Sequence, residues 1–357
     1  MNEDTKRKLN FLRGKIKLQP IYESIQLLDI SDDEYFSPKY AEYISNSKLG
    51  LINPEQNGNR QLYIEGFGSQ QVSDSLLFGS CIHQSILQPD DYEMIDNIDR
   101  PSAKMGFMAD NIISFRDKGY SIYNSIIAAS NKISYYKGKL TDSRFNEVVE
   151  KCYKYYIQYR RFIKNNTSSK IPMFLDKSTR DKFYLCKYSI DTNRLISAKL
   201  NPAYIVEKPL SINEGTLLMD VKATTDEGKE YTIRLKAKLD NFTIDTESQI
   251  VTLNDVKTTR HKVFDFRESF EQYHYYRQLG MYMYMLSIYV RYKYKFKPKF
   301  NYGNFLIVST VPDYESGVYA ARNSDFERGM EEFSYLLRLV VWEIYMKRDC
   351  LVDAFEL

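Results

Sequence analysis

The feature that most constrains the fold is a run of β-rich segments in the second half of the chain. Four such segments follow one another between residues 203 and 259: AYIVEKPLSI, GTLLMDVKATT, EYTIRLKAKLDNFTI and QIVTLNDVKTT. Turn signals at NEG, TDEGKE and DTES separate them. Strands joined by short turns pair as antiparallel neighbours. The sequence therefore predicts an antiparallel meander at the centre of a sheet.

Helical patterns surround this meander, and a predicted pair of strands, NFLIVSTV and GVYAAR, follows it. Residues 1–60 are predicted to form short helices joined by irregular chain. The pattern of helices, meander, helix, strands and helix indicates an α/β (α+β) fold, with a mixed sheet flanked by helices and a largely helical N-terminal half. The longer helices are predicted over 72–88, 107–136, 142–165, 266–290 and 323–347.

Composition excludes several classes of protein. The 50 Lys and Arg against 47 Asp and Glu give a net charge of +3, which excludes a histone-like coat but allows a local basic groove. The four cysteines are far apart and form no CxxC pair, so the sequence lacks the spacing that is typical of zinc ribbons and iron–sulfur clusters. Reduced, buried thiols are expected. No stretch reaches the roughly 18 apolar residues of a spanning helix. We expect a cytoplasmic protein without a membrane partner.

The tripeptide DVK occurs twice, at residues 220–222 and 255–257. An aspartate and a lysine two apart on a strand share one face. In the hairpin through DTES, Asp240 falls opposite Leu253 or Asp255, so Asp240 and Asp255 could share a cation. The other hairpin places Asp220 opposite Arg234, about 20 Å along the strand from Asp240. The second DVK is therefore the candidate site.

These segments, LKAKLDNFTID and IVTLNDVKTT, resemble the core of the PD-(D/E)XK nuclease superfamily, in its RecB-like exonuclease branch. Further pieces occur in the order that is typical of the phage RecE-type (exonuclease VIII) nucleases. YISNSKLGLINP is similar to the S-x-S-x-L…P segment, and LFGSCIHQSILQPDDYE resembles the G-x-x-x-H-x-x-L-L-x-P motif. YIVEKPLSI supplies a glutamate before the core strands, and YYRQLGMYMY matches the Q-x-x-x-Y helix. The acid before the lysine is Asp255, where many members have Glu.

The resemblance covers about residues 40–320, and the chain as a whole is predicted to form four segments. Residues 1–70 correspond to an N-terminal segment and 71–200 to a helical region that carries the histidine motif. Residues 201–322 correspond to the nuclease core and 323–357 to a C-terminal helix. No family motif falls in residues 100–200, so the resemblance assigns no role to that part.

Phosphodiester hydrolysis needs charge stabilisation at the phosphate, which hard cations on carboxylates provide. Mg²⁺, or Mn²⁺ in its place, prefers oxygen ligands. Asp240 and Asp255 are the predicted ligands, with the carbonyl of Val256, and Lys257 would orient or help deprotonate the attacking water. The resemblance adds His83 and Glu207 to the metal or phosphate contacts.

Two Q-x-x-x-Y pairs compete for the place beside the site. The family pattern favours Gln278 and Tyr282 over Gln272 and Tyr276. The two pairs differ by six residues, about 240° around a helix, so both cannot face the site.

The resulting hypothesis is a Mg²⁺-dependent exonuclease acting on linear duplex DNA in phage-type recombination or replication, in the host cytoplasm if phage-encoded. The resemblance implies, for some members, a single-strand annealing protein as partner and ring-like homo-oligomers. A structure-specific endonuclease of the same superfamily and a non-catalytic DNA-binding relic are the alternatives. Polarity, DNA against RNA, and the number of metals stay open.

Overall fold

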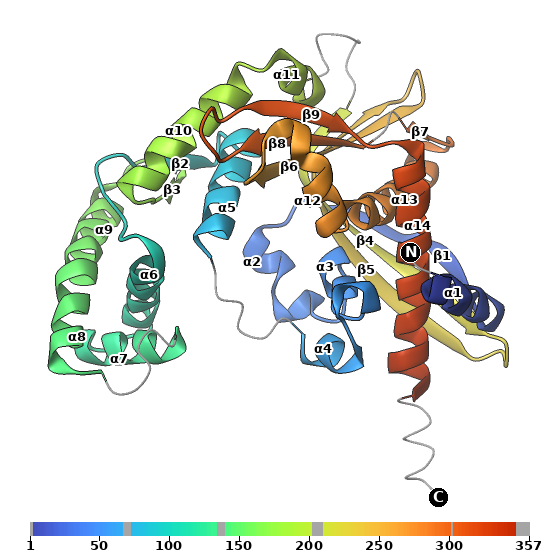
Figure 1. The fold of residues 1–357 in the computed structure, drawn as a ribbon, viewed down its shortest axis with the longest axis horizontal. Helices are drawn as coiled ribbons and strands as arrows, with labels where there is room; N and C mark the ends of the chain where they lie inside the picture. The colour runs from blue at the N-terminus through green and yellow to red at the C-terminus, as the bar shows by residue number, and fades with distance from the viewer. Residues whose placement is uncertain (1–2, 67–72, 134–139, 202–209, 301–302, 348–357) are drawn as a thin grey trace, which may run out of the picture. The chain divides into compact units, whose positions relative to one another are not determined.

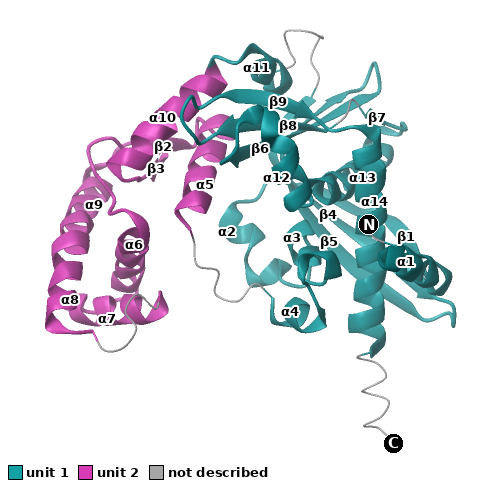
Figure 2. Ribbon diagram, viewed as in Figure 1, with its two compact units in different colours: residues 1–68, 192–357 teal, residues 69–191 magenta. Residues whose placement is uncertain are grey.

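The computed structural model describes residues 3–66, 73–133, 140–201, 210–300 and 303–347. The chain divides into two compact units (Figure 2), one formed by residues 1–68 with 192–357 and the other by residues 69–191. The predicted N-terminal segment, core and closing helix thus contribute to the first unit.

A mixed sheet forms the centre of the first unit (Figure 1). Its strands lie in the order β1-β4-β5-β6-β8-β9, and β7 also pairs with β6. The segment β4-β5-β6 is the predicted antiparallel meander, whereas β8 runs parallel to β6 and antiparallel to β9. The α/β class with a mixed sheet is confirmed. The strands are β1 (Ile16–Leu28), β4 (Leu210–Thr225), β5 (Glu230–Asp245), β6 (Ile250–Thr259), β7 (Lys299–Phe300), β8 (Asn304–Ser309) and β9 (Ser316–Ala320).

The prediction of short helices and irregular chain over residues 1–60 was wrong for β1, which spans thirteen residues. Pro20 obscured this strand in the sequence, because proline cannot donate a ladder hydrogen bond. β1 lies at the edge of the sheet, where it pairs only with β4, and an edge strand tolerates proline. Tertiary pairing therefore decides this element.

The NEG tripeptide at residues 213–215 is also not a turn, as the sequence suggested. β4 continues through it from Leu210 to Thr225. Glu214 nevertheless has a left-handed backbone, with φ of 51°. The register sets Asn213 opposite Asn241 and Gly215 opposite Leu239, so Glu214 falls beside Asp240. The turn signal marks a local irregularity within one long strand.

Two long helices, α13 (Tyr275–Tyr294) and α14 (Asn323–Val340), pack together, and α13 lies against β1, β4 and β5. Their crossing is close because glycine occupies it on both sides. A Cβ atom on Gly329 would lie 1.8 Å from the carbonyl oxygen of Tyr276, and one on Gly280 would lie 2.5 Å from the carbonyl carbon of Gly329. The other helices of this unit are α1 (Glu3–Lys15), α2 (Asp32–Tyr35), α3 (Asn46–Gly50), α4 (Arg60–Glu65), α11 (Arg194–Leu200) and α12 (Phe266–Gln272).

The second unit is mainly helical, with its own apolar core and a short parallel strand pair. The predicted helix 142–165 is one helical run with a π turn at Val149–Tyr153. The predicted helix 107–136 is instead two helices, because Gly119 takes a positive φ of 86° between them. The elements are α5 (Asp74–Leu87), β2 (Tyr92–Met94), α6 (Ala103–Asp117), α7 (Ile122–Lys132), α8 (Asp142–Val148), α9 (Lys154–Asn165), β3 (Ile171–Met173) and α10 (Lys177–Asp191).

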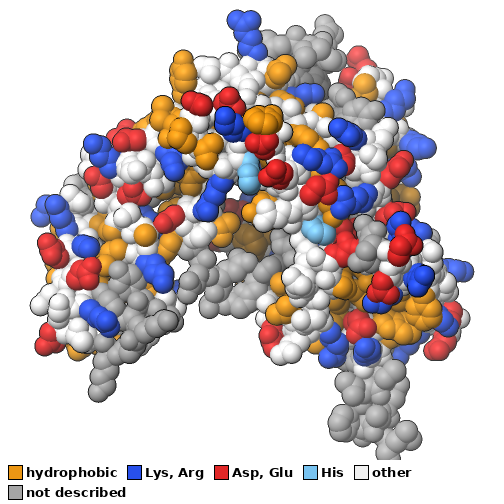
Figure 3. All heavy atoms as spheres, viewed as in Figure 1, with side chains coloured by type: hydrophobic (Ala, Val, Ile, Leu, Met, Phe, Trp, Pro, Cys, Tyr) orange, Lys and Arg blue, Asp and Glu red, His pale blue; other side chains and the backbone are white. Residues whose placement is uncertain are grey.

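Three features of the structure concern the charged residues, the cysteines and the apolar character of the helices. Lys and Arg side chains are interspersed with Asp and Glu on the face drawn in Figure 3. Three cysteines in the described part of the chain, Cys81, Cys152 and Cys186, are buried. Among the described helices, none combines the length and apolar character that crossing a membrane requires.

We expect the substitution Gly329→Ala to lower the free energy of unfolding by about 1–3 kcal/mol, because the added methyl group overpacks the α13–α14 crossing. Urea unfolding followed by circular dichroism measures this change. Gly14→Ala on α1 is the matched control, since a Cβ there meets nothing within 4 Å. A Gly329→Ala protein as stable as the control would contradict the close crossing.

Candidate active site

Two carboxylates from neighbouring strands approach each other at the middle of the sheet. Glu214 of β4 and Asp240 of β5 each offer a carboxylate oxygen within 4.8 Å of the other's. The Glu214 carboxylate is also 3.2 Å from Lys238, whose ammonium bonds Asp32 at 2.5 Å. Oxygen donors at this spacing are the kind that hard divalent cations take, so the pair could hold such a cation.

Asp255 of β6 belongs to the same level of the sheet. The β5–β6 register sets Asn241 opposite Asn254, and continuing it by one residue sets Asp240 opposite Asp255. The sequence had left Leu253 and Asp255 as the two alternatives. Asp255 is only 4% exposed, and its Oδ1 accepts a hydrogen bond of 2.6 Å from Gln278. Its position is therefore fixed by both β6 and α13.

Lys257 follows Asp255 on the same strand and turns toward it. Its Nζ lies 2.6 Å from Asp255 Oδ2 and 5.1 Å from the centre of the Tyr275 ring. Burial opposes the charge on this ammonium, but the nearby Asp255 and Asp240 carboxylates outweigh burial and raise its pKa. Lys257 is thus a fixed positive charge beside two carboxylates.

The amide of Val256 completes the contact between β5 and β6. Its N–H donates a hydrogen bond of 2.7 Å to Asp240 Oδ2. The sequence had singled out the carbonyl of Val256 as a metal ligand, and that role stays a prediction. The observed bond uses the N–H of Val256, and it holds Asp240 close to the residue that follows Asp255.

The structure separates the two Q-x-x-x-Y pairs. Gln278 bonds Asp255, and both Gln278 and Tyr282 line a small cavity beside that carboxylate. Gln272 ends α12 and is exposed, whereas Tyr276 points to another cluster of polar side chains. The predicted single helix 266–290 is broken between Gln272 and Tyr276, because His274 takes a left-handed backbone with φ of 52°.

Glu214 is the site residue that sequence reasoning missed. It lies in NEG, where Asn and Gly are typical of a turn. A left-handed backbone at a non-glycine residue costs about 1–3 kcal/mol and persists only where its surroundings impose it. Such strain often accompanies a functional site, so the misread turn signal was the available clue.

Two predicted residues, His83 and Glu207, remain. His83 is half-buried on α5 in the second unit, and its part in the site stays a prediction. Glu207 falls within 202–209, outside the described residues. The first DVK lies at the far end of β4 as predicted, with Asp220 opposite Arg234 and Lys222 paired to Glu230 at 2.5 Å.

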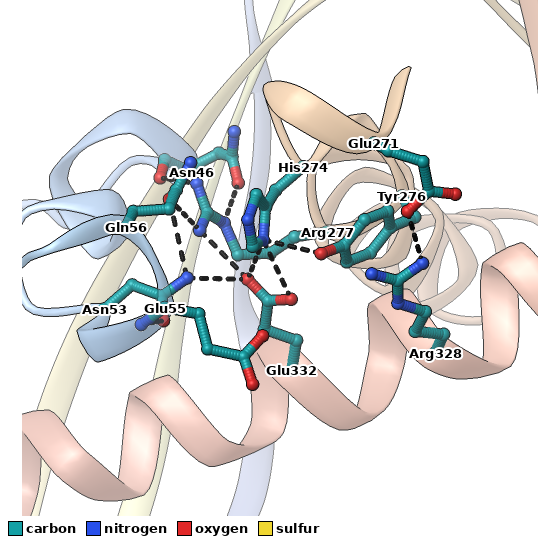
Figure 4. Close-up of polar contacts among 10 residues, drawn as sticks. All are labelled: Asn46, Asn53, Glu55, Gln56, Glu271, His274, Tyr276, Arg277, Arg328 and Glu332. Carbon is teal, nitrogen blue, oxygen red and sulfur yellow. Dashed lines mark hydrogen bonds and ion pairs between the residues drawn. The ribbon is translucent and has the colours of Figure 1, made fainter. Parts of the chain in front are cut away.

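A second cluster of ionisable groups is centred on Glu332 of α14 (Figure 4). His274 Nδ1 lies 2.8 Å from Glu332 Oε1, and the hydroxyl of Tyr276 lies 2.6 Å from the same His274 nitrogen. Arg277 and Asn53 donate to Glu332 Oε1 at 3.1 and 2.9 Å. This buried cluster connects the N-terminal segment to α13 and α14.

Glu55, His274 and Glu332 offer ligand atoms within 4.8 Å of one another, but the cluster is better explained without a metal. The guanidinium of Arg277 is 3% exposed and already supplies the positive charge that Glu332 needs. A metal ion would have to enter beside that buried cation. We interpret the cluster as an ion-pair network that holds the N-terminal segment in place.

Comparison with known proteins adds a likeness of shape. No family model and no curated protein matches the sequence. A crystal structure of a candidate exonuclease from Eubacterium rectale is similar with a TM-score of 0.42 and 12% identity, over 88% of this chain and 86% of that one. A TM-score of 0.42 is a loose match, so the function of this chain is argued from its own residues.

We expect Glu332→Gln to destabilise the protein by about 3–5 kcal/mol at pH 7, because it leaves the Arg277 charge buried without its partner. Burial would raise the pKa of Glu332, but the His274 hydrogen bond and the Arg277 charge outweigh it and lower that pKa. A lowered carboxylate pKa stabilises the fold above the unfolded-state value, and this stabilisation is lost as the pH falls through the folded-state value.

The difference between wild type and Glu332→Gln should therefore shrink as the pH falls below about 4.3, the ordinary value for glutamate. Urea unfolding across pH measures it. Glu331→Gln, on the exposed neighbour, is the control and should leave stability unchanged. A pH-independent difference would argue against an ionised Glu332.

Proposed function

We propose that this chain is a divalent-metal-dependent DNA nuclease, acting as an exonuclease on linear duplex DNA. The observation that carries the proposal is the convergence of Asp240, Asp255 and Lys257 at one level of the sheet. The Lys257 ammonium is 2.6 Å from Asp255, and the amide next to Asp255 bonds Asp240. An oxygen-rich cation site beside a fixed positive charge is suited to phosphodiester hydrolysis.

Mg²⁺, with Mn²⁺ as a substitute, fits the donor set because every carboxylate here offers hard oxygen. Glu214, Asp240 and Asp255 would hold it, with the carbonyl of Val256, His83 and Glu207 as further predicted ligands. When bound, such a cation lowers the pKa of water and neutralises charge that develops on the phosphate. The fit rests on the spacing of Glu214 and Asp240, whose oxygens lie within 4.8 Å.

The remaining side chains would orient the reactants. Lys257 carries a charge that can bind the phosphate or align the attacking water. Gln278 fixes one oxygen of Asp255 and leaves the other toward Lys257. Tyr282 lines the cavity beside the same carboxylate. These residues act by position, which contributes to catalysis through preorganised charge.

The substrate and setting rest on the sequence resemblance. It supports linear duplex DNA ends as substrate, phage-type recombination or replication as the process, and a single-strand annealing protein as partner. A structure-specific endonuclease and a DNA-binding relic are the alternatives that the cleavage assay separates.

The test is an incubation of end-labelled linear duplex and closed circular duplex DNA with Mg²⁺ or with EDTA. Loss of the linear DNA alone, only with Mg²⁺, is the expected result, and the label released first gives the polarity. Cutting of the circle would indicate an endonuclease. Folded protein that cleaves neither form, in Mg²⁺ or Mn²⁺, would overturn the proposal of an active nuclease.

Asp255→Asn and Lys257→Met should each lower the rate of metal-dependent cleavage by roughly 10²-fold or more, since each removes charge that is placed at the reaction centre. The first DVK provides a matched control. Asp220→Asn and Lys222→Met change the same residue types on a neighbouring strand and should leave the rate within about two-fold. Equal effects at both copies would refute the choice of the second DVK.

Glu214→Gln tests the carboxylate that the sequence did not reveal. We expect it to weaken Mn²⁺ binding at least about ten-fold, because a neutral amide replaces a charged oxygen ligand. Isothermal titration measures the affinity without DNA. Glu230→Gln at the far end of the same hairpin is the control. Unchanged Mn²⁺ affinity in Glu214→Gln would remove Glu214 from the metal site.

A further inference from the structure

A row of four asparagine side chains crosses four strands of the sheet. The register pairs Asn213 of β4 with Asn241 of β5, Asn241 with Asn254 of β6, and Asn254 with Asn304 of β8. Each amide donates to the next: Asn304 to Asn254 at 2.9 Å, Asn254 to Asn241 at 2.7 Å, and Asn241 to Asn213 at 2.7 Å. Except for Asn213, these side chains are buried.

Three asparagines of this row are chain neighbours of the three carboxylates. Asn213 precedes Glu214, Asn241 follows Asp240, and Asn254 precedes Asp255. The fourth, Asn304, has Gly303 and Phe305 beside it and flanks no carboxylate. The asparagine row and the carboxylate level are therefore adjacent, one residue apart on each of three strands.

Backbone pairing between β5 and β6 ends at the carboxylate level, and pairing between β4 and β5 is interrupted there. The β5–β6 ladder runs from the pair Asp245 and Ile250 to the pair Asn241 and Asn254, and in the described register it goes no further. The β4–β5 ladder passes over Glu214, whose φ is positive. Between β5 and β6, ordinary sheet hydrogen bonds thus do not set the spacing of Asp240 and Asp255. On these two strands the asparagine row is the last paired level before the carboxylates.

On β6 the row and the site point to different sides. Asn254 donates a hydrogen bond to the carbonyl of Lys199 in α11. Asp255 instead accepts a hydrogen bond from Gln278 of α13. Neighbouring residues on a strand alternate in this way. The asparagine row can therefore hold β6 in position from the face opposite Asp255, so it does not occupy the place of a cation or a substrate.

We propose that this asparagine row positions Glu214, Asp240 and Asp255 for metal binding, with Asn241 and Asn254 as the decisive pair. The inference rests on the proposed metal site. Buried amides are costly unless they are paired, and here the amides form one continuous chain of hydrogen bonds. Such a chain fixes strand register, and a slip of one residue would turn the carboxylates to the other face.

The test compares Asn254→Val and Asn241→Val with Asn304→Val. Each removes one or more links of the row, but only the first two asparagines flank a carboxylate. We measure Mn²⁺ affinity by electron paramagnetic resonance and melting temperature by circular dichroism. Asn254→Ser, which keeps a hydrogen-bond donor, serves if a valine variant does not fold.

Asn254→Val and Asn241→Val should raise the Kd for Mn²⁺ about ten-fold or more, the size seen when a metal ligand loses its support. Asn304→Val should change the Kd less than about two-fold, even where it lowers the melting temperature equally. In DNA cleavage, Asn254→Val should raise the Mg²⁺ concentration needed for half-maximal rate and leave the rate at saturating Mg²⁺ within about three-fold.

Two results would overturn the inference while leaving the proposed function intact. One is an unchanged Kd in Asn254→Val and Asn241→Val. The other is an equal loss of affinity in Asn304→Val, which would make the effect one of general stability. A wild-type protein that binds no Mn²⁺ would instead overturn the proposed metal site, and the positioning role with it.

Discussion

Carboxylates that lie close together in a half-buried place repel one another, and the first unit brings carboxylate oxygens of Glu214 and Asp240 within 4.8 Å of each other, with Asp255 on the next strand. In a low-dielectric setting such repulsion is large unless cations or hydrogen-bond donors offset it. Each carboxylate accordingly has a fixed partner from a neighbouring element. The partners are Lys238 for Glu214, the amide of Val256 for Asp240, and Gln278 with Lys257 for Asp255.

The sheet is irregular where the carboxylates lie, and one of those donors depends on that irregularity. The amide of Val256 bonds a side chain of β5, at the level where the β5–β6 ladder has ended. Glu214 lies where β4 adopts a left-handed backbone. A regular β5–β6 ladder would pair the Val256 amide with a backbone carbonyl of β5 and leave it unavailable to Asp240. Directly beside this irregular level, the asparagine side chains link β4, β5 and β6 by hydrogen bonds.

The helix α13 connects the site to the rest of the unit. Gln278 faces Asp255, while its neighbour Arg277 bonds the buried Glu332 of α14. Gly280 and Gly329 let the two helices approach closely enough for that bond. The buried ion pair thus fixes the helix on one side, and the same helix presents the glutamine on the other.

The choice between the two DVK copies could be made from the sequence because hairpin length limits register. The turn through DTES restricted the partner of Asp240 to two residues. The register pairs Leu253 with Phe242 and, continued by one residue beyond Asn241 and Asn254, sets Asp255 opposite Asp240. Gln278 and Tyr282, the pair that the pattern favoured, lie beside Asp255, although the break at His274 was not foreseen. These are local properties, in which spacing along the chain determines which side chains meet.

Other features depended on partners far away in the sequence. β1 contains a proline and was predicted as irregular chain, and it became a strand because β4 offers an edge to pair with. Glu214 was hidden in an apparent turn, and only the pairing of β4 with β5 brings it beside Asp240. The sequence by itself determined the meander and the lysine motif, since hydrophobic alternation and turn length act over a few residues. The tertiary structure alone decided the third carboxylate and the asparagine row, because both require strands to be aligned across the sheet.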